Sequence, residues 1–345
     1  MRKSNIELLR FLMCITVVLY HTRVGQSYSF SLFSPIIGSG VLLFGIISGY
    51  FMVNKKWPGI TKLILTILFY LGLIIVLNLL LEFIFIGKVD GFGNRHGTSG
   101  WLFHHGTVNM WYIWSLLFVY IASLGINWFL THTNAWYALF SIFLFYLVFM
   151  LAINQLQYYK NFSMNNIFYL SVVYMFGGWL KLHREKLKLK KIDILWVASI
   201  SWISLVMFVN LIIVIVMGPG VNPFFGNNNF SSVFTAISMF YLFTKINIRE
   251  NKIYYFLGKL SIPIYFLHWS LIDLIRLSLK SLSFNKEIYF LVVSLVDFFI
   301  TLLISLIVVY PIDWTIKKID GFLNKSYQKI YQFITYKINL IQKNQ

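Results

Sequence analysis

Long apolar runs, separated by short polar segments, are the feature that most limits what this 345-residue chain can fold into. A helix needs roughly 20 apolar residues to cross the hydrocarbon core of a bilayer, and the chain has room for about ten such runs. Apolar residue types make up 59% of the sequence and charged types only 12%. A soluble domain of this composition would leave too much apolar surface in water. The sequence therefore predicts an all-α, polytopic integral membrane protein with about ten transmembrane helices.

The segments between the runs are polar or rich in Gly and Pro, as at 54–59 and 218–223. Such residues are typical of turns and loops rather than of helix interiors. The predicted helices are 6–23, 36–53, 62–87, 110–130, 135–152, 167–182, 193–217, 232–246, 256–279 and 287–312.

The positions of Lys and Arg predict the orientation, because cytoplasmic loops carry an excess of both. If the N-terminus is cytoplasmic, most of these residues fall in cytoplasmic segments and few in outer loops. We therefore expect both termini in the cytoplasm. The connection near 125–134 contains neither Lys nor Arg, so it gives no support to this topology at that point.

The chain is expected to consist of a ten-helix membrane domain, 1–315, and a basic amphipathic cytoplasmic tail, 316–345. The tail mixes Lys with Ile, Tyr and Phe, a composition typical of a helix that lies on a membrane surface. A net charge of +18 would suggest nucleic acid as a partner of a soluble protein. Here it favours anchoring to anionic membrane lipid, and we predict no nucleic-acid partner.

Two ionisable residues on the first helix are the strongest candidates for function, since charged groups inside hydrocarbon are costly. Arg10 and His21 are eleven residues apart. At 100° per residue they share one helical face, with an axial separation of about 16.5 Å. Two simpler interpretations stay open. For Arg10, the simpler interpretation is an anchor whose side chain extends to the lipid headgroups. For His21, it is a histidine at the membrane interface that takes no part in chemistry.

Other ionisable residues lie on later helices. His268 is midway along 256–279, and Asp273 and Arg276 follow it as i, i+3 neighbours that we expect to pair with each other. Asp297 is central in 287–312 and needs an interior partner that the sequence does not identify. Glu82 is expected near the outer end of the helix 62–87. There it would either pair with His21 or with Arg95 of the following loop, or face the water at the lipid headgroups.

Three histidines of the outer loop do not form a convincing metal site, because adjacent histidines cannot easily point at one ion and no carboxylate or cysteine pattern accompanies them. We therefore predict no metal. These residues are His96, His104 and His105.

Four segments, in order along the chain, carry a family resemblance. The first is the Arg10 and His21 pair, and the second is Leu-Phe-Gly-Ile-Ile-Ser-Gly-Tyr at 43–50. The third is Met-Trp-Tyr at 110–112, and the fourth is Gly-Lys-Leu-Ser-Ile-Pro-Ile-Tyr-Phe-Leu-His at 258–268. Together these segments resemble those of the acyltransferase-3 family of bacterial membrane acyltransferases. The resemblance implies an enzyme like the polysaccharide O-acetyltransferases.

The resemblance implies transfer of an acyl group, usually acetyl, from cytoplasmic acetyl-CoA or another acyl-CoA to a hydroxyl of a cell-surface or exported polysaccharide. It implies the bacterial cell membrane as location, a glycan acceptor that is extracellular or lipid-linked, and polysaccharide biosynthesis machinery as a candidate partner. His21 would be the general base, and Arg10 a donor-side or structural cation.

The remaining site residues implied by the resemblance fall into two sets. Lys55 and Lys56 stand where the family often has an Arg-rich run, and they would face the acyl-CoA phosphates. The residues expected to contact substrate are Glu82, Ser48, Tyr50, Trp111 and His268.

Two other functions remain open. A transporter or flippase for a glycan or lipid-linked intermediate would also have many spans and few interior charges, although the sequence offers no convincing inverted repeat. A non-catalytic partner of a polysaccharide synthase is the third hypothesis.

Overall fold

In the residues that its computed structural model describes, the chain consists of helices joined by short connections, with two strands of two residues each. The described residues are 3–22, 27–55, 57–86, 111–155, 164–184, 188–189, 192–219, 221, 224, 230–279 and 285–343. The helices are α1 (Ser4–Thr22), α2 (Tyr28–Met52), α3 (Trp57–Ile86), α4 (Trp111–His132), α5 (Ala135–Gln155), α6 (Met164–His183), α7 (Ile194–Met217), α8 (Phe230–Lys245), α9 (Lys252–Leu279) and α10 (Lys286–Lys343). The strands β1 (Lys188–Leu189) and β2 (Ile192–Asp193) pair antiparallel.

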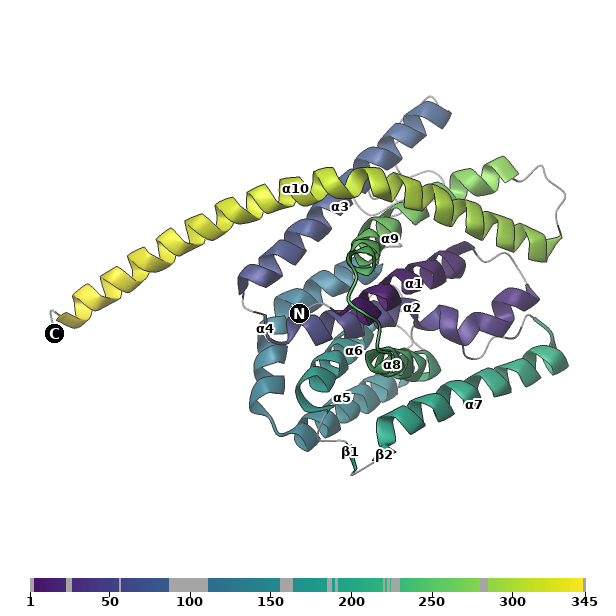
Figure 1. The fold of residues 1–345 in the computed structure, drawn as a ribbon, viewed down its shortest axis with the longest axis horizontal. Helices are drawn as coiled ribbons and strands as arrows, with labels where there is room; N and C mark the ends of the chain where they lie inside the picture. The colour runs from purple at the N-terminus through teal and green to yellow at the C-terminus, as the bar shows by residue number, and fades with distance from the viewer. Residues whose placement is uncertain are drawn as a thin grey trace.

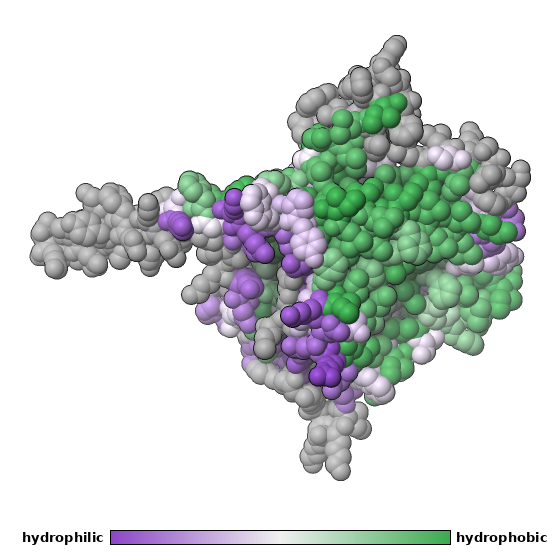
Figure 2. All heavy atoms as spheres, turned by 45° about the horizontal axis from the view of Figure 1, so that its top comes forward, coloured by the Kyte–Doolittle hydropathy of each residue, from purple (hydrophilic) through white to green (hydrophobic). Residues whose placement is uncertain are grey.

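Apolar side chains cover much of the outside of the bundle, as expected of a protein whose solvent is lipid. Figure 2 shows a broad apolar band on one face, with a large group of hydrophilic residues on one side of it and a smaller group at the opposite edge. On α7, Ile215, Val216 and Met217 are all exposed, Val216 by 75%. Soluble monomers rarely expose apolar patches of this extent. The predicted class, an all-helical membrane protein, is thereby confirmed in its main features.

Six helices, in the part of the chain that the structure describes, are long and apolar enough to cross a membrane. These stretches are Ser4–Thr22, Tyr28–Met52, Ile60–Leu77, Tyr112–His132, Ile194–Met217 and Lys286–Leu323. A shorter apolar stretch covers Ala135–Phe149. The count of ten spans and the cytoplasmic location of both termini stay predictions.

The start of α2 was predicted eight residues too late, at 36. The helix instead begins at Tyr28, after an N-cap at Ser27, and Pro35 lies inside it. Proline cannot donate to the carbonyl four residues earlier, which here belongs to Ser31. Asn210 of α7 donates to the Ser31 oxygen at 2.9 Å and to the Leu32 oxygen at 3.0 Å. A side chain from another helix thus satisfies the carbonyl that the proline leaves open.

Helix α1 lies at the centre of the bundle (Figure 1). It packs most extensively against α9 and α2, and also contacts α8 and α10. Its buried side chains include Ile6, Leu9, Met13, Val17 and Val18. The helix that carries the two candidate functional residues is therefore enclosed by protein rather than by lipid.

Asp193 fastens the start of α7 to the end of α8. It caps α7 by accepting from the Trp196 amide, it accepts from the Tyr241 hydroxyl at 2.7 Å, and it pairs with Lys245. Partial burial opposes ionisation of this carboxyl, but the bonds from Lys245 and Tyr241 outweigh it and lower the pKa of Asp193.

Two glycines allow α2 and α6 to approach closely. A Cβ atom at Gly49 would collide with the backbone of Tyr174, and one at Gly177 would collide with the backbone of Ile46. Small residues at helix contacts are the usual means of close packing in membranes. Gly49 belongs to the Ser-Gly-Tyr segment, so close packing explains why glycine stands there.

Replacing Gly49 by Ala should lower the free energy of unfolding by about 1–3 kcal/mol, because a well-packed contact between backbones must open. Equilibrium unfolding of the purified protein in mixed micelles measures this. Gly72→Ala is the matched control, since a Cβ atom there meets nothing within 4 Å. Equal stability of the two variants would contradict the assigned role of Gly49.

Candidate functional site

The charged pair of α1 is held inside the bundle. Nη1 of Arg10 lies 3.0 Å from Oε2 of Glu7, one helical turn away, and the two side chains are 20% and 0% exposed. Gly258 of α9 provides the space, because a Cβ atom at that position would collide with the Glu7 carboxylate. The guanidinium also lies 5.8 Å from the ring centre of Phe51. Arg10 is thus fixed by Glu7 and does not simply extend to the headgroups.

A small cavity of about 100 Å³ opens beside Arg10 between α1, α2, α3, α4 and α9. Its wall is largely apolar and aromatic, with a few polar groups. Oγ of Ser48 and the hydroxyl of Tyr120 lie 3.0 Å apart in this wall. The lining residues are Arg10, Phe44, Ser48, Leu63, Thr66, Ile67, Tyr112, Ile113, Leu116, Tyr120, Ser261, Ile262, Tyr265 and Phe266.

A row of polar rings connects this cavity to His21. The rings of Tyr112 and Tyr265, both in the cavity wall, are 5.2 Å apart. The ring of Tyr265 is 5.8 Å from that of His268, and the ring of His268 is 5.2 Å from that of His21. Arg10, which borders the cavity, and His21, next to His268, therefore lie at opposite ends of this row.

His21 faces α9, and its position is fixed from two neighbouring helices. Nη2 of Arg276 donates to the His21 carbonyl oxygen at 2.7 Å. The hydroxyls of Thr22 and Ser294, on α1 and α10, lie 2.5 Å apart. The last carbonyls of a helix have no partner within it, so a cation from another helix is a favourable one. The sequence had paired Arg276 with Asp273, whose side chain the structure does not describe.

Asp297, fully buried on α10, has a partner that the sequence did not reveal. Oγ1 of Thr301 donates to its Oδ1 at 3.3 Å, from one turn further along the same helix.

The structure places the other predicted site residues in different regions. Ser48 and His268 belong to the cavity and the row, whereas Tyr50 is buried away from them. The Tyr50 hydroxyl accepts from Arg184 at 3.5 Å, and Nζ of Lys181 lies 5.0 Å above its ring. Lys55 is exposed just beyond the end of α2. The side chains of Glu82 and Trp111, all of Lys56, and the outer-loop histidines lie outside the described residues.

Tyr120 was missed among the candidate residues. The signal was available, because Tyr112, Leu116 and Tyr120 recur every fourth residue and so share a face of α4. A phenol that recurs on the buried face of an apolar helix needs a polar partner, and Ser48 supplies it.

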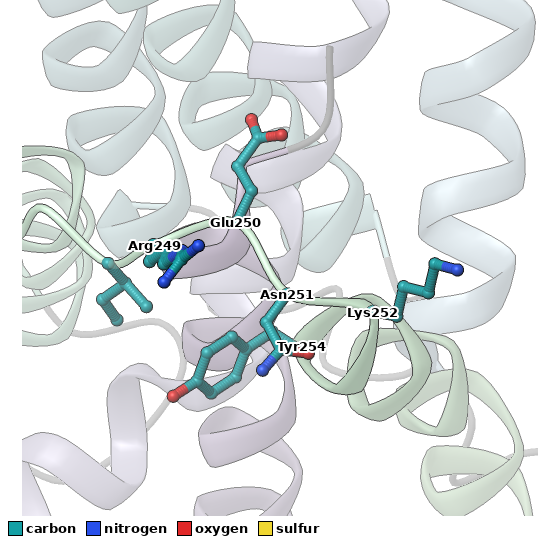
Figure 3. A pocket seen from close by; sticks show the side chains of 6 residues that line it. Arg249, Glu250, Asn251, Lys252 and Tyr254 are labelled. Atoms are coloured by element: carbon teal, nitrogen blue, oxygen red, sulfur yellow. The ribbon is translucent and has the colours of Figure 1, made fainter.

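A second hollow lies at the surface between α8 and α9, lined by Ile248, Arg249, Glu250, Asn251, Lys252 and Tyr254. Figure 3 shows that Glu250 and Lys252 extend away from Arg249 rather than toward a shared point. This arrangement does not form a convergent ligand site, so the cavity beside Arg10 is the better candidate.

Arg10→Leu should lower the free energy of unfolding by about 3–5 kcal/mol, because it removes the cation beside a fully buried carboxylate. The amount of folded protein extracted from membranes reports this. The double variant Glu7→Gln/Arg10→Leu should recover most of the loss, since no charge then remains at that place. An equal loss of folded protein in the single and double variants would show that the unpaired Glu7 carboxylate is not the cause of the destabilisation.

A family model described as an acyltransferase domain matches residues 3–314, which include α1, the cavity and the row of rings. No curated protein and no solved structure gives a match. The matched region spans nearly the whole chain and contains all four segments on which the sequence resemblance rests. The chain belongs to the acyltransferase-3 family of membrane acyltransferases.

Proposed function

We propose that the protein transfers an acyl group, most simply acetyl, from cytoplasmic acyl-CoA to a hydroxyl of a cell-surface or exported polysaccharide at the bacterial cell membrane. The observation that carries this proposal is the row of polar rings contributed by α4, α9 and α1, with Arg10 beside a cavity at one end and His21 at the other. Such a row provides a polar route through an otherwise apolar bundle.

His21 is the proposed general base. Neutral imidazole accepts protons near physiological pH, which suits removal of a hydroxyl proton. The hydroxyl oxygen then forms an ester bond to the acyl carbon, the bond from that carbon to the CoA sulfur breaks, and the proton ends on the released thiol. Two contacts support this role: the hydrogen bond from Arg276 holds the backbone of His21, and the ring of His268 packs against its imidazole.

Cations beside the cavity and around the end of α2 suit an anionic donor. Arg10 borders the cavity, and Lys181 and Arg184 surround Tyr50 near the end of α2. Lys55 lies just beyond that end. Lysine and arginine both bind phosphates, arginine with the more defined geometry. Lys55 and Lys56 remain the proposed contacts for acyl-CoA, and Lys181 and Arg184 are additional candidates.

His21→Ala should abolish O-acylation of the surface polysaccharide while polymer export continues, because the base is lost and the helix remains. Ester content per sugar residue, measured in deletion, wild-type and variant cells, tests this. His132→Ala is the matched control, since His132 is exposed at the end of α4. Loss of polymer with unchanged ester content per residue would contradict acyl transfer and favour transport.

The double variant Glu7→Gln/Arg10→Leu separates a structural role of Arg10 from a role in the reaction. If Arg10 contacts the donor, this variant should reach the membrane and still add no ester. Ester content restored to the wild-type level, at equal protein abundance, would show that Arg10 serves only to neutralise Glu7.

A further inference from the structure

The last helix is far longer than a membrane span requires. Helix α10 has 58 residues, equivalent to about 87 Å at the helical rise, whereas the hydrocarbon core is about 30 Å thick. Between Ile288 and Ile312 its only charged residue is Asp297, but from Asp313 onward charged residues recur to the end of the helix. The second part of α10 therefore belongs outside the hydrocarbon.

Contacts with α9 end where α10 leaves the bundle. The rings of Tyr310 and Phe256 stack at 5.8 Å, and Nζ of Lys259 lies 3.0 Å from Oδ2 of Asp313. Ile316 is still buried, but Phe322 is 71% exposed. In Figure 1 the rest of α10 runs away from the other labelled helices. We call the part from Ile316 to Lys343 the tail helix.

The tail helix is amphipathic. Eight apolar positions fall within a sector of about 100°, counted at 100° per residue. The lysines, with the exception of Lys337 at the sector's edge, fall on the remaining arc. The apolar positions are 316, 319, 323, 327, 330, 334, 338 and 341, and the other lysines are Lys317, Lys318, Lys325, Lys329 and Lys343.

The spacing favours a lipid surface over a partner helix. The apolar positions repeat every eleven residues, as in 316, 327 and 338, which is close to the period of a straight helix. A seven-residue repeat would instead put Ser326 and Lys337 into the contact seam.

We propose that the tail helix binds the anionic headgroups of the membrane leaflet from which α10 emerges, with its apolar positions at the acyl boundary and its lysines among the phosphates. Basic amphipathic helices bind in this way through buried apolar area and attraction to anionic lipid. Pro311 and Gly321 provide places to bend, because Pro311 cannot donate to the carbonyl of Ile307 and glycine weakens a helix interior. This inference does not depend on which acyl group or acceptor the enzyme uses.

Amide hydrogen exchange of the full-length protein in nanodiscs tests the proposal. Exchange across the tail helix should be at least tenfold slower in phosphatidylcholine with 30% phosphatidylglycerol than in phosphatidylcholine alone. The variant with Lys317, Lys318, Lys325 and Lys329 changed to Gln should lose this difference. A variant with Ile330 and Ile334 changed to Asn should exchange fast in both lipids, because it lacks the apolar face.

Matched controls separate the tail from the rest of the molecule. Lys55→Gln/Lys62→Gln, which removes exposed cations elsewhere, should leave exchange of the tail unchanged, and exchange in α1 and α9 should stay the same in every variant. Equal exchange of the tail in the two lipids would overturn the proposal. Protection that appears only with two protein copies per nanodisc would also overturn it, in favour of a second copy as partner.

Discussion

The ion pair between Glu7 and Arg10 is the constraint on which the arrangement of this bundle depends. Two charges in the first half of an apolar helix cannot face hydrocarbon without a large cost, so α1 has to be enclosed by other helices. Helices α2 and α9 lie closest to it, and Gly258 lets α9 approach directly over the Glu7 carboxylate. Once α1 is central, any further polar residue on its face, His21 included, also points into protein.

The same rule of internal satisfaction applies to the backbone. Inside a membrane each carbonyl needs a donor from protein, and Pro35 removes one from α2. Asn210 provides the replacement and so fixes α7 against α2. Toward the other end of α2, Gly49 and Gly177 bring α6 within backbone contact. A few hydrogen bonds and close backbone contacts thus fix the positions of the helices around the cavity. Most of the apolar packing is non-directional and does not fix them in this way.

These two rules explain which features could be predicted from the sequence. The apolar runs predicted the helices, because that pattern is local. The early start of α2 was missed because its explanation, Asn210, lies far away in the sequence. The bond from Arg276 to the His21 carbonyl was missed for the same reason, since a backbone oxygen leaves no trace in the residue pattern. Tyr120, in contrast, repeats Tyr112 on one helical face and was recognisable.

The distance between the two ends of the row limits how the proposed reaction can proceed. Arg10 and His21 are about 16.5 Å apart along the helix axis, so one small group cannot contact both. The cavity beside Arg10, at about 100 Å³, has space for the end of a donor but not for a nucleotide. The anionic part of an acyl-CoA would therefore stay with the cations near Tyr50, and only its thioester arm would extend along the tyrosines toward His21. An uncharged arm suits that path, because the row consists of hydroxyls and aromatic rings, and a phosphate would find no Lys or Arg between Arg10 and Arg276 among the residues described along it.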